Sequence, residues 1–277
     1  MKLHVRHTTA YQYTEPLLYS VQNLHLWPLS GPGQTVLDWR IQVPGRLHAQ
    51  PDGLGNRMHS FTLTAGPEQG LRELRIVAEG TVLTLAEPVF EDAPGLPHPA
   101  FYRRSTTHAE PHPRMTAWAR VVVPRIAPGQ CETPVDQVLD LVHAVANKVR
   151  YRPGRTAVET TALEAFDWGL GVCQDQAHVL VAVCRSLGLP ARYVSGYFYA
   201  ANEPDLASHA WVDVCIDVQA RRWVSVDVTH RCLVDERHIR LACGNDYTVC
   251  PPVKGLRRGG GDEQLSVDIR IEPVSAG

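Results

Sequence analysis

The segment between residues 208 and 228 constrains the fold most strongly, because polar and apolar residues alternate along it in two runs. Extended side chains point to alternate faces of a strand. The residues that fall on the apolar face are Ala210, Val212, Val214 and Ile216 in the first run and Val224, Val226 and Val228 in the second. The residues on the polar face are His209, Trp211 and Asp213, then Trp223, Ser225 and Asp227. This pattern predicts an antiparallel hairpin whose valine-rich face packs in a core.

A helix-forming apolar stretch begins at Cys173, directly after Gly169 and Gly171, and ends at Leu187-Gly188. A thiol in the first turn of a helix lies near unpaired backbone N–H groups and the positive end of the helix dipole. These favour the thiolate. We expect the polar face of the hairpin to meet this helix. Cys173, His209 and Asp227 would then supply, in chain order, a nucleophile, a base and a group that orients the base.

The hairpin register decides how His209 and Asp227 meet. A turn centred near Val218 places the two directly opposite each other, within reach of a carboxylate–imidazole hydrogen bond. A turn centred on Ala220 places His209 opposite Arg231 instead. Residues 217–222 can all be turn residues, so the sequence leaves both registers open. A shared role for His209 and Asp227 requires the first register, or a bulge that restores it.

Short strand-like runs separated by turn residues dominate the first part of the chain, which predicts a β-rich N-terminal domain over residues 1–90. The runs are 8–13, 36–43, 58–63, 71–78 and 80–85. Residues 91–132 are rich in proline and histidine and are predicted to be a surface linker, with a short ordered segment at 118–123. Thr133-Pro134 predicts a helix start, with Thr133 as N-cap, and Thr161 a second. The region 133–277 is predicted to be an α+β domain, whose sheet is completed by runs at 247–250 and 265–271.

Composition excludes several classes of partner. The formal net charge of −2 gives no reason to expect nucleic acid or an anionic membrane surface. No apolar run approaches the roughly 20 residues of a membrane span. The N-terminus lacks the apolar core of a signal peptide, so we expect a cytoplasmic protein. Seven scattered cysteines, with no Cys-x-x-Cys pair, argue against a disulfide framework and favour a reducing compartment.

Other interpretations compete with a thiol site. His230 and Cys232 could join Cys173 and His209 as zinc ligands, but no pair has zinc-finger spacing, so we predict no metal. We likewise predict no cofactor. A peptide-binding scaffold that performs no catalysis is another possibility. Asp175 is expected to serve the helix dipole, and His178 to be a hydrogen-bonded structural group. The basic turn at 254–258 is either a solvated loop or the rim of a site for an acidic substrate.

The chain resembles bacterial transglutaminase-like proteins, of the superfamily that relates transglutaminases to papain-like cysteine peptidases. Three segments carry the resemblance: Gly171-Val172-Cys173-Gln174-Asp175-Gln176-Ala177-His178, the run from Leu187 to Tyr197, and Ser208-His209-Ala210-Trp211-Val212 followed by Asp227. The first half is similar to the β-rich domain that accompanies these proteins. Departures are Val228 where relatives often have proline, Asn245 where arginine is expected, and Val249 where an acidic residue is expected.

The resemblance implies a papain/transglutaminase-like core, with helices packed on an antiparallel sheet, preceded by a small all-β domain. It also implies a Cys–His–Asp triad, which maps onto Cys173, His209 and Asp227. The expected function is a thiol enzyme that acts on amide bonds of a peptide or protein substrate through a thioester. Hydrolysis of a peptide or isopeptide is favoured over acyl transfer to an amine. The backbone N–H of Cys173 is the expected first oxyanion donor, with Trp168 and Gln174 as weak candidates for the second.

Overall fold

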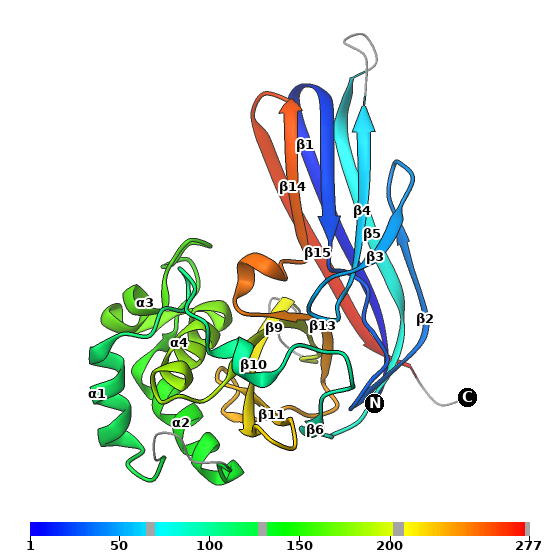
Figure 1. Cartoon of the computed structure of the whole chain (residues 1–277). Helices are drawn as coiled ribbons and strands as arrows, with labels where there is room; N and C mark the ends of the chain where they lie inside the picture. Colours follow the sequence, from blue (N-terminus) through cyan, green and yellow to red (C-terminus); the bar gives the residue numbers. More distant parts are fainter. Residues whose placement is uncertain (65–69, 127–131, 202–207, 275–277) are drawn as a thin grey trace.

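The computed structural model describes residues 1–64, 70–126, 132–201 and 208–274, and it contains two antiparallel sheets and a group of helices. One sheet forms a long blade, and the second lies between its lower end and the helices (Figure 1). The predicted mixture of helix and antiparallel sheet is confirmed. Among the helices of the described residues, none combines the length and apolar character needed to cross a membrane.

The first sheet is organised around the long strand β1, which pairs with β4, β5, β14 and β15. Its strands are β1 (Lys2–Leu24), β2 (Gln34–Gln42), β3 (His48–Pro51), β4 (Arg57–Thr64), β5 (Leu71–Thr84), β14 (Val253–Gly259) and β15 (Glu263–Pro273). Each strand-like run predicted before residue 90 overlaps one of these strands, although residues 43 and 85 lie one position beyond a strand end. The runs at 71–78 and 80–85 belong to one strand, β5.

The end of the chain corrects one prediction. The runs at 247–250 and 265–271 were expected to complete the sheet of the second half. Instead, Tyr247–Val249 forms a short 3-10 helix, η3, and β15 pairs with β1 from Leu3↔Pro273 to Tyr13↔Glu263. The chain therefore returns to its N-terminal sheet, a long-range pairing that local periodicity does not encode. The division of the chain at residues 90 and 132 stays a prediction.

The second sheet has the order β12-β11-β10-β9-β13, with β6 paired to β11. Its strands are β6 (Val89–Glu91), β9 (Ala191–Phe198), β10 (Ser208–Asp217), β11 (Arg222–Asp227), β12 (Cys232–Leu233) and β13 (His238–Gly244). A separate pair of two-residue strands, β7 (Arg150–Tyr151) and β8 (Leu170–Gly171), is parallel and leads into the cysteine helix.

The helices are α1 (Pro113–Val122), α2 (Val135–Lys148), α3 (Ala162–Trp168) and α4 (Cys173–Ser186), with a 3-10 turn, η1, at Pro99–Arg103. Pro134, not Thr133, is the N-cap of α2, and it makes no side-chain cap. Thr161 caps α3 as expected, with Glu164 completing a capping box. The predicted linker is more ordered than expected, because it contains η1 and α1, and α1 buries Met115 and Ala119.

The valine-rich face of the hairpin packs with α4 in one core, which corrects our expectation that the polar face meets the helix. That core contains Val212, Val214, Val224 and Val226 together with Leu180 and Val181 of α4. A second core joins the first sheet to β9 and β13 through Tyr197, Ile239 and Leu241. Helix α4 therefore reaches His209 at its N-terminal end, not through its side.

Candidate active site

Cys173 is the first residue of α4, and the turn before it is fixed by a carboxylate. Asp175 Oδ2 accepts hydrogen bonds from the backbone N–H of Val172 and the hydroxyl of Thr156, both at 2.7 Å. A Cβ on Gly171 would lie 2.5 Å from Cβ of Asp175, so only glycine fits there without a shift. Burial raises the pKa of Asp175. Asp175 thus serves the start of the helix, as expected, and Cys173 is held partly exposed beside it.

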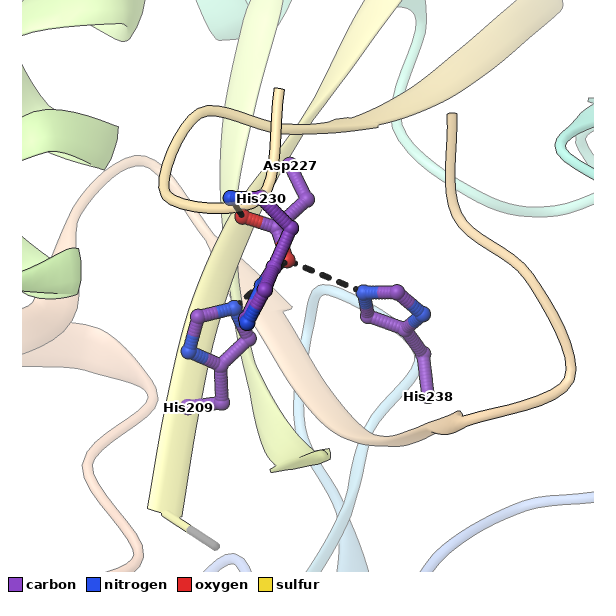
Figure 2. A group of neighbouring side chains, drawn as sticks. All are labelled: His209, Asp227, His230 and His238. Carbon is purple, nitrogen blue, oxygen red and sulfur yellow. Dashed lines mark hydrogen bonds and ion pairs between the residues drawn. The ribbon is translucent and has the colours of Figure 1, made fainter. Parts of the chain in front are cut away.

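His209, near the start of β10, and Asp227, at the end of β11, are in direct contact. The distance from His209 Nε2 to Asp227 Oδ2 is 2.7 Å, and both side chains are fully buried. Figure 2 shows the imidazole and the carboxylate facing each other across the hairpin. A buried pair at this distance is a charge-assisted hydrogen bond that fixes the orientation of the ring.

The register of the hairpin matches neither predicted alternative. Val212 pairs with Val226 and Asp213 with Ser225, which centres the hairpin on Gln219. A bulge lies between Cys215 and Asp217, and Asp217 Oδ1 accepts the backbone N–H groups of Gln219 and Ala220 in the turn. Extrapolated along the strands, this register places His209 opposite Thr229. Asp227 lies two residues from that position, on the same face of the sheet as His209. A diagonal pair is still within reach of a histidine side chain, so direct opposition is not required.

The second nitrogen of His209, Nδ1, is buried and makes no hydrogen bond of ordinary length and angle to the residues that the structure describes. Burial alone would lower the pKa of His209. The charge and hydrogen bond of Asp227, with a further hydrogen bond and charge from Cys173, raise it to about 10. The structure therefore brings Cys173, His209 and Asp227 together. Asp227 is bonded to Nε2 of His209, and Cys173 lies close enough to the same ring to raise its pKa.

Two further histidines surround Asp227, and the sequence analysis did not place them there. His230 Nδ1 lies 2.7 Å and His238 Nε2 3.0 Å from Asp227 Oδ2 (Figure 2). Burial would raise the pKa of Asp227, but the charge of His209 and the hydrogen bonds of the three rings hold it well below its usual range. His238 follows a turn and its side chain reaches back to Asp227, so no local spacing marks it. The sequence offers His230 only as a possible zinc ligand with Cys232, Cys173 and His209, and not as a partner of Asp227.

A hydrogen-bond chain joins the cysteine helix to the turn after Asp227. Gln176 of α4 is buried, and its Oε1 accepts the hydroxyl hydrogen of Thr229 at 2.7 Å. Its Nε2 donates to the carbonyl of Val149 at 2.8 Å. Gln176 therefore fixes the helix that begins at Cys173 relative to the Asp227 turn, despite the Val228 departure.

The remaining titratable groups near the helix are structural. His178 is fully buried, and its Nε2 accepts the backbone N–H of Tyr247. Burial lowers the pKa of His178 to about 3, so the ring is neutral, as its structural role requires. Burial raises the pKa of each of five cysteines: Cys184, Cys215, Cys232, Cys243 and Cys250. Cys131 lies outside the described residues.

The candidates for a second oxyanion donor differ in their environments. Gln174 Nε2 donates to the carbonyl of Val158 at 3.0 Å, so this amide already has an acceptor. The Trp168 side chain is 53% exposed. The backbone N–H of Cys173 lies in the first turn of α4, where helix N–H groups have no intrahelical partner. It stays the best-placed donor.

Two family models match separate parts of this chain, and relatives match nearly all of it. Residues 124–228 match the model of the transglutaminase-like superfamily, and residues 3–83 match the bacterial transglutaminase-like N-terminal region. An uncharacterised protein of Mycobacterium leprae is 30% identical over 281 residues, which cover 98% of each chain. An uncharacterised protein of Mycobacterium bovis is 28% identical over 295 residues, covering 98% of this chain and 91% of its own.

A solved structure shares the fold. A candidate cysteine protease from Cytophaga hutchinsonii superimposes with a TM-score of 0.76 at 20% identity, over 100% of this chain and 92% of its own. At this identity the likeness describes the fold alone. It extends over both the N-terminal sheet and the part of the chain that carries Cys173, His209 and Asp227.

Proposed function

We propose, on the premise that this chain belongs to the transglutaminase-like superfamily, that it is a thiol enzyme acting on amide bonds through Cys173, His209 and Asp227. One observation carries the proposal. His209 is bonded to a buried carboxylate through Nε2, while Cys173, at a helix N-terminus, acts on the same ring. This is the relationship among nucleophile, base and orienting group that acyl transfer needs.

The chemistry follows from these contacts. His209 takes the proton of the Cys173 thiol, and Asp227 stabilises the resulting imidazolium. The thiolate attacks the amide carbonyl, and the backbone N–H of Cys173 donates to the oxyanion that forms. His209 then gives its proton to the leaving amine as the carbon–nitrogen bond breaks, which leaves a thioester on Cys173. Water or an amine resolves the thioester and releases a carboxylic acid or a new amide.

Hydrolysis of a peptide or isopeptide is the favoured outcome. This preference rests on the fold shared with the candidate cysteine protease of Cytophaga hutchinsonii. Transfer of a glutamine acyl group to an amine uses the same three residues, and the difference is which nucleophile reaches the thioester. The substrate is a peptide or protein, and a cytoplasmic location stays a prediction of the sequence.

A library of peptides and glutamine donors, with and without an added primary amine, tests the proposal. We expect release of free carboxylate without the amine, and loss of turnover in Cys173→Ala. Amine incorporation as the main product would assign the chain to acyl transfer instead. Activity that survives in Cys173→Ala, or no turnover of any substrate together with an unreactive Cys173, would favour the scaffold interpretation.

A further inference from the structure

Asp227 is surrounded by more imidazole than a triad requires. Three ring nitrogens converge on its Oδ2: His209 Nε2 at 2.7 Å, His230 Nδ1 at 2.7 Å and His238 Nε2 at 3.0 Å. The four potential ligand atoms all lie within 4.8 Å of one another. A carboxylate oxygen has two lone pairs, so three ring nitrogens crowd this one oxygen.

Three histidines and one aspartate are a ligand set typical of transition-metal sites. Neutral imidazole nitrogens with one carboxylate oxygen suit zinc and its neighbours in the first row. Ligand atoms bound to one tetrahedral zinc at about 2.0–2.1 Å lie roughly 3.3 Å apart. The rings would therefore retreat from Oδ2 by about half an ångström on binding. His230 has the room for this, because its side chain is 21% exposed.

His238 is oriented in the way metal-bound histidines usually are. Its Nδ1 lies 3.1 Å from Asp235 Oδ1 and 3.2 Å from the backbone nitrogen of Asp235, and these contacts hold the ring with Nε2 facing Asp227. A carboxylate on the far nitrogen of a ligand histidine fixes the tautomer and raises its basicity. Asp235 is itself held by Arg237. His230 is held from the other side, because its ring stacks on Phe198 with centroids 3.9 Å apart.

A cavity borders one side of this cluster. His238 and Asp235 line a cavity of about 300 Å³, which is also lined by Trp211, Arg240 and Leu29. Cys173 is not among its lining residues. The side chain of His238 is fully buried where it borders this cavity, whereas that of His230 is 21% exposed, so His230 is the ligand that solvent reaches.

We infer that Asp227, His230 and His238, together with His209, form a binding site for a divalent first-row transition-metal ion such as zinc, which competes with the triad. A ring whose Nε2 holds a metal keeps its proton on Nδ1 and cannot accept the thiol proton. The bound ion would therefore switch the enzyme off. This inhibitory consequence rests on the proposed function, whereas the binding site itself does not.

Titration of the chelator-treated full chain with Zn²⁺, followed by calorimetry, tests the site. We expect one ion per chain, and at least tenfold weaker binding in His230→Asn and His238→Asn. The matched control is His48→Asn, because His48 is exposed on β3 and outside the cluster. Circular dichroism verifies that each variant folds, and half-buried His230 gives the safer substitution. Absence of saturable binding would overturn the inference.

Cobalt separates this site from an ordinary thiol site. The Co²⁺ form should lack thiolate-to-metal charge-transfer absorption, and Cys173→Ala should retain Zn²⁺ binding. Binding that is lost in Cys173→Ala and kept in His230→Asn would assign the ion to the thiol and contradict the inference. If wild-type turnover is found, Zn²⁺ should inhibit it. The His230→Asn variant should need at least a tenfold higher Zn²⁺ concentration for the same inhibition. If the protein shows no turnover, the proposed function is contradicted. The metal site is not, because it is tested by Zn²⁺ binding alone.

Discussion

His209 Nε2 lies 2.7 Å from Asp227 Oδ2, although the hairpin register places the two residues diagonally and not opposite each other. The pair is therefore set by side-chain reach across the hairpin together with burial. Because Asp227 is also bonded to the backbone N–H and ring of His230, its position is fixed from several sides.

The Asp227→Asn variant should fold and lose most activity, by roughly 10²- to 10⁴-fold, because the ring loses its orienting charge. The pKa of His209, raised to about 10, should fall toward its ordinary value, which NMR titration of the ring protons measures. The control is Asp268→Asn, because Asp268 is exposed on β15. This variant should change neither turnover nor the pKa of His209. Unaltered turnover in Asp227→Asn would remove Asp227 from the mechanism.

The Gly171→Ala variant should distort the start of the cysteine helix. Its new Cβ would meet Asp175 Cβ at 2.5 Å and Oδ2 at 2.8 Å. Overpacking of this kind costs about 1–3 kcal/mol, so urea unfolding should show a loss of that size, together with reduced turnover. The control is Gly53→Ala, where the added methyl meets open space. Wild-type stability and turnover in Gly171→Ala would show that the Asp175 cap does not position Cys173.

Stability should fall as the pH drops below about 6.5, because buried histidines such as His7, His59 and His178 resist protonation. Burial lowers the pKa of His7 to about 4 and that of His178 to about 3. Between these values and the ordinary value near 6.5, the unfolded chain binds more protons than the folded chain, so the free energy of unfolding decreases as the pH falls. His7 alone should contribute a loss of about 3 kcal/mol by pH 4.

The measurement is urea unfolding from pH 7 to pH 4. His7 Nδ1 lies 2.8 Å from the hydroxyl of Tyr197, across the junction of the two sheets, and glutamine there can hydrogen-bond without titrating. His7→Gln should therefore reduce the slope, whereas His48→Gln, on an exposed part of β3, should not. Identical slopes for His7→Gln and wild type would mean that His7 is not the group responsible.

Local pattern in the sequence predicted the elements of the site well. The alternation in 208–228 identified two strands and the face shared by His209 and Asp227. Glycines 169 and 171 marked the helix start at Cys173. Gly169, in a left-handed conformation, ends α3, and Gly171 packs closely against Asp175 at the start of α4. These features depend on neighbours in the chain, so sequence periodicity records them.

What the sequence did not predict depends on residues far apart. The pairing of β15 with β1 joins opposite ends of the chain, and neither strand carries a signal that names its partner. The register of the hairpin depends on a bulge at Cys215 and a turn capped by Asp217, which shift it by a single residue. His238 meets Asp227 only because β13 lies beside β9 in the finished sheet.

The reactivity of Cys173 tests the central claim most directly. In a Cys131→Ser background, we would measure the rate of iodoacetamide alkylation of each cysteine at about pH 6, where only an activated thiol reacts quickly. Cys173 should react fastest and should slow in His209→Asn, whereas Cys232, which is also only partly buried, should react slowly in both proteins. A Cys173 that reacts no faster than Cys232, or whose rate is unaffected by His209→Asn, would contradict the proposed thiol–imidazole pair.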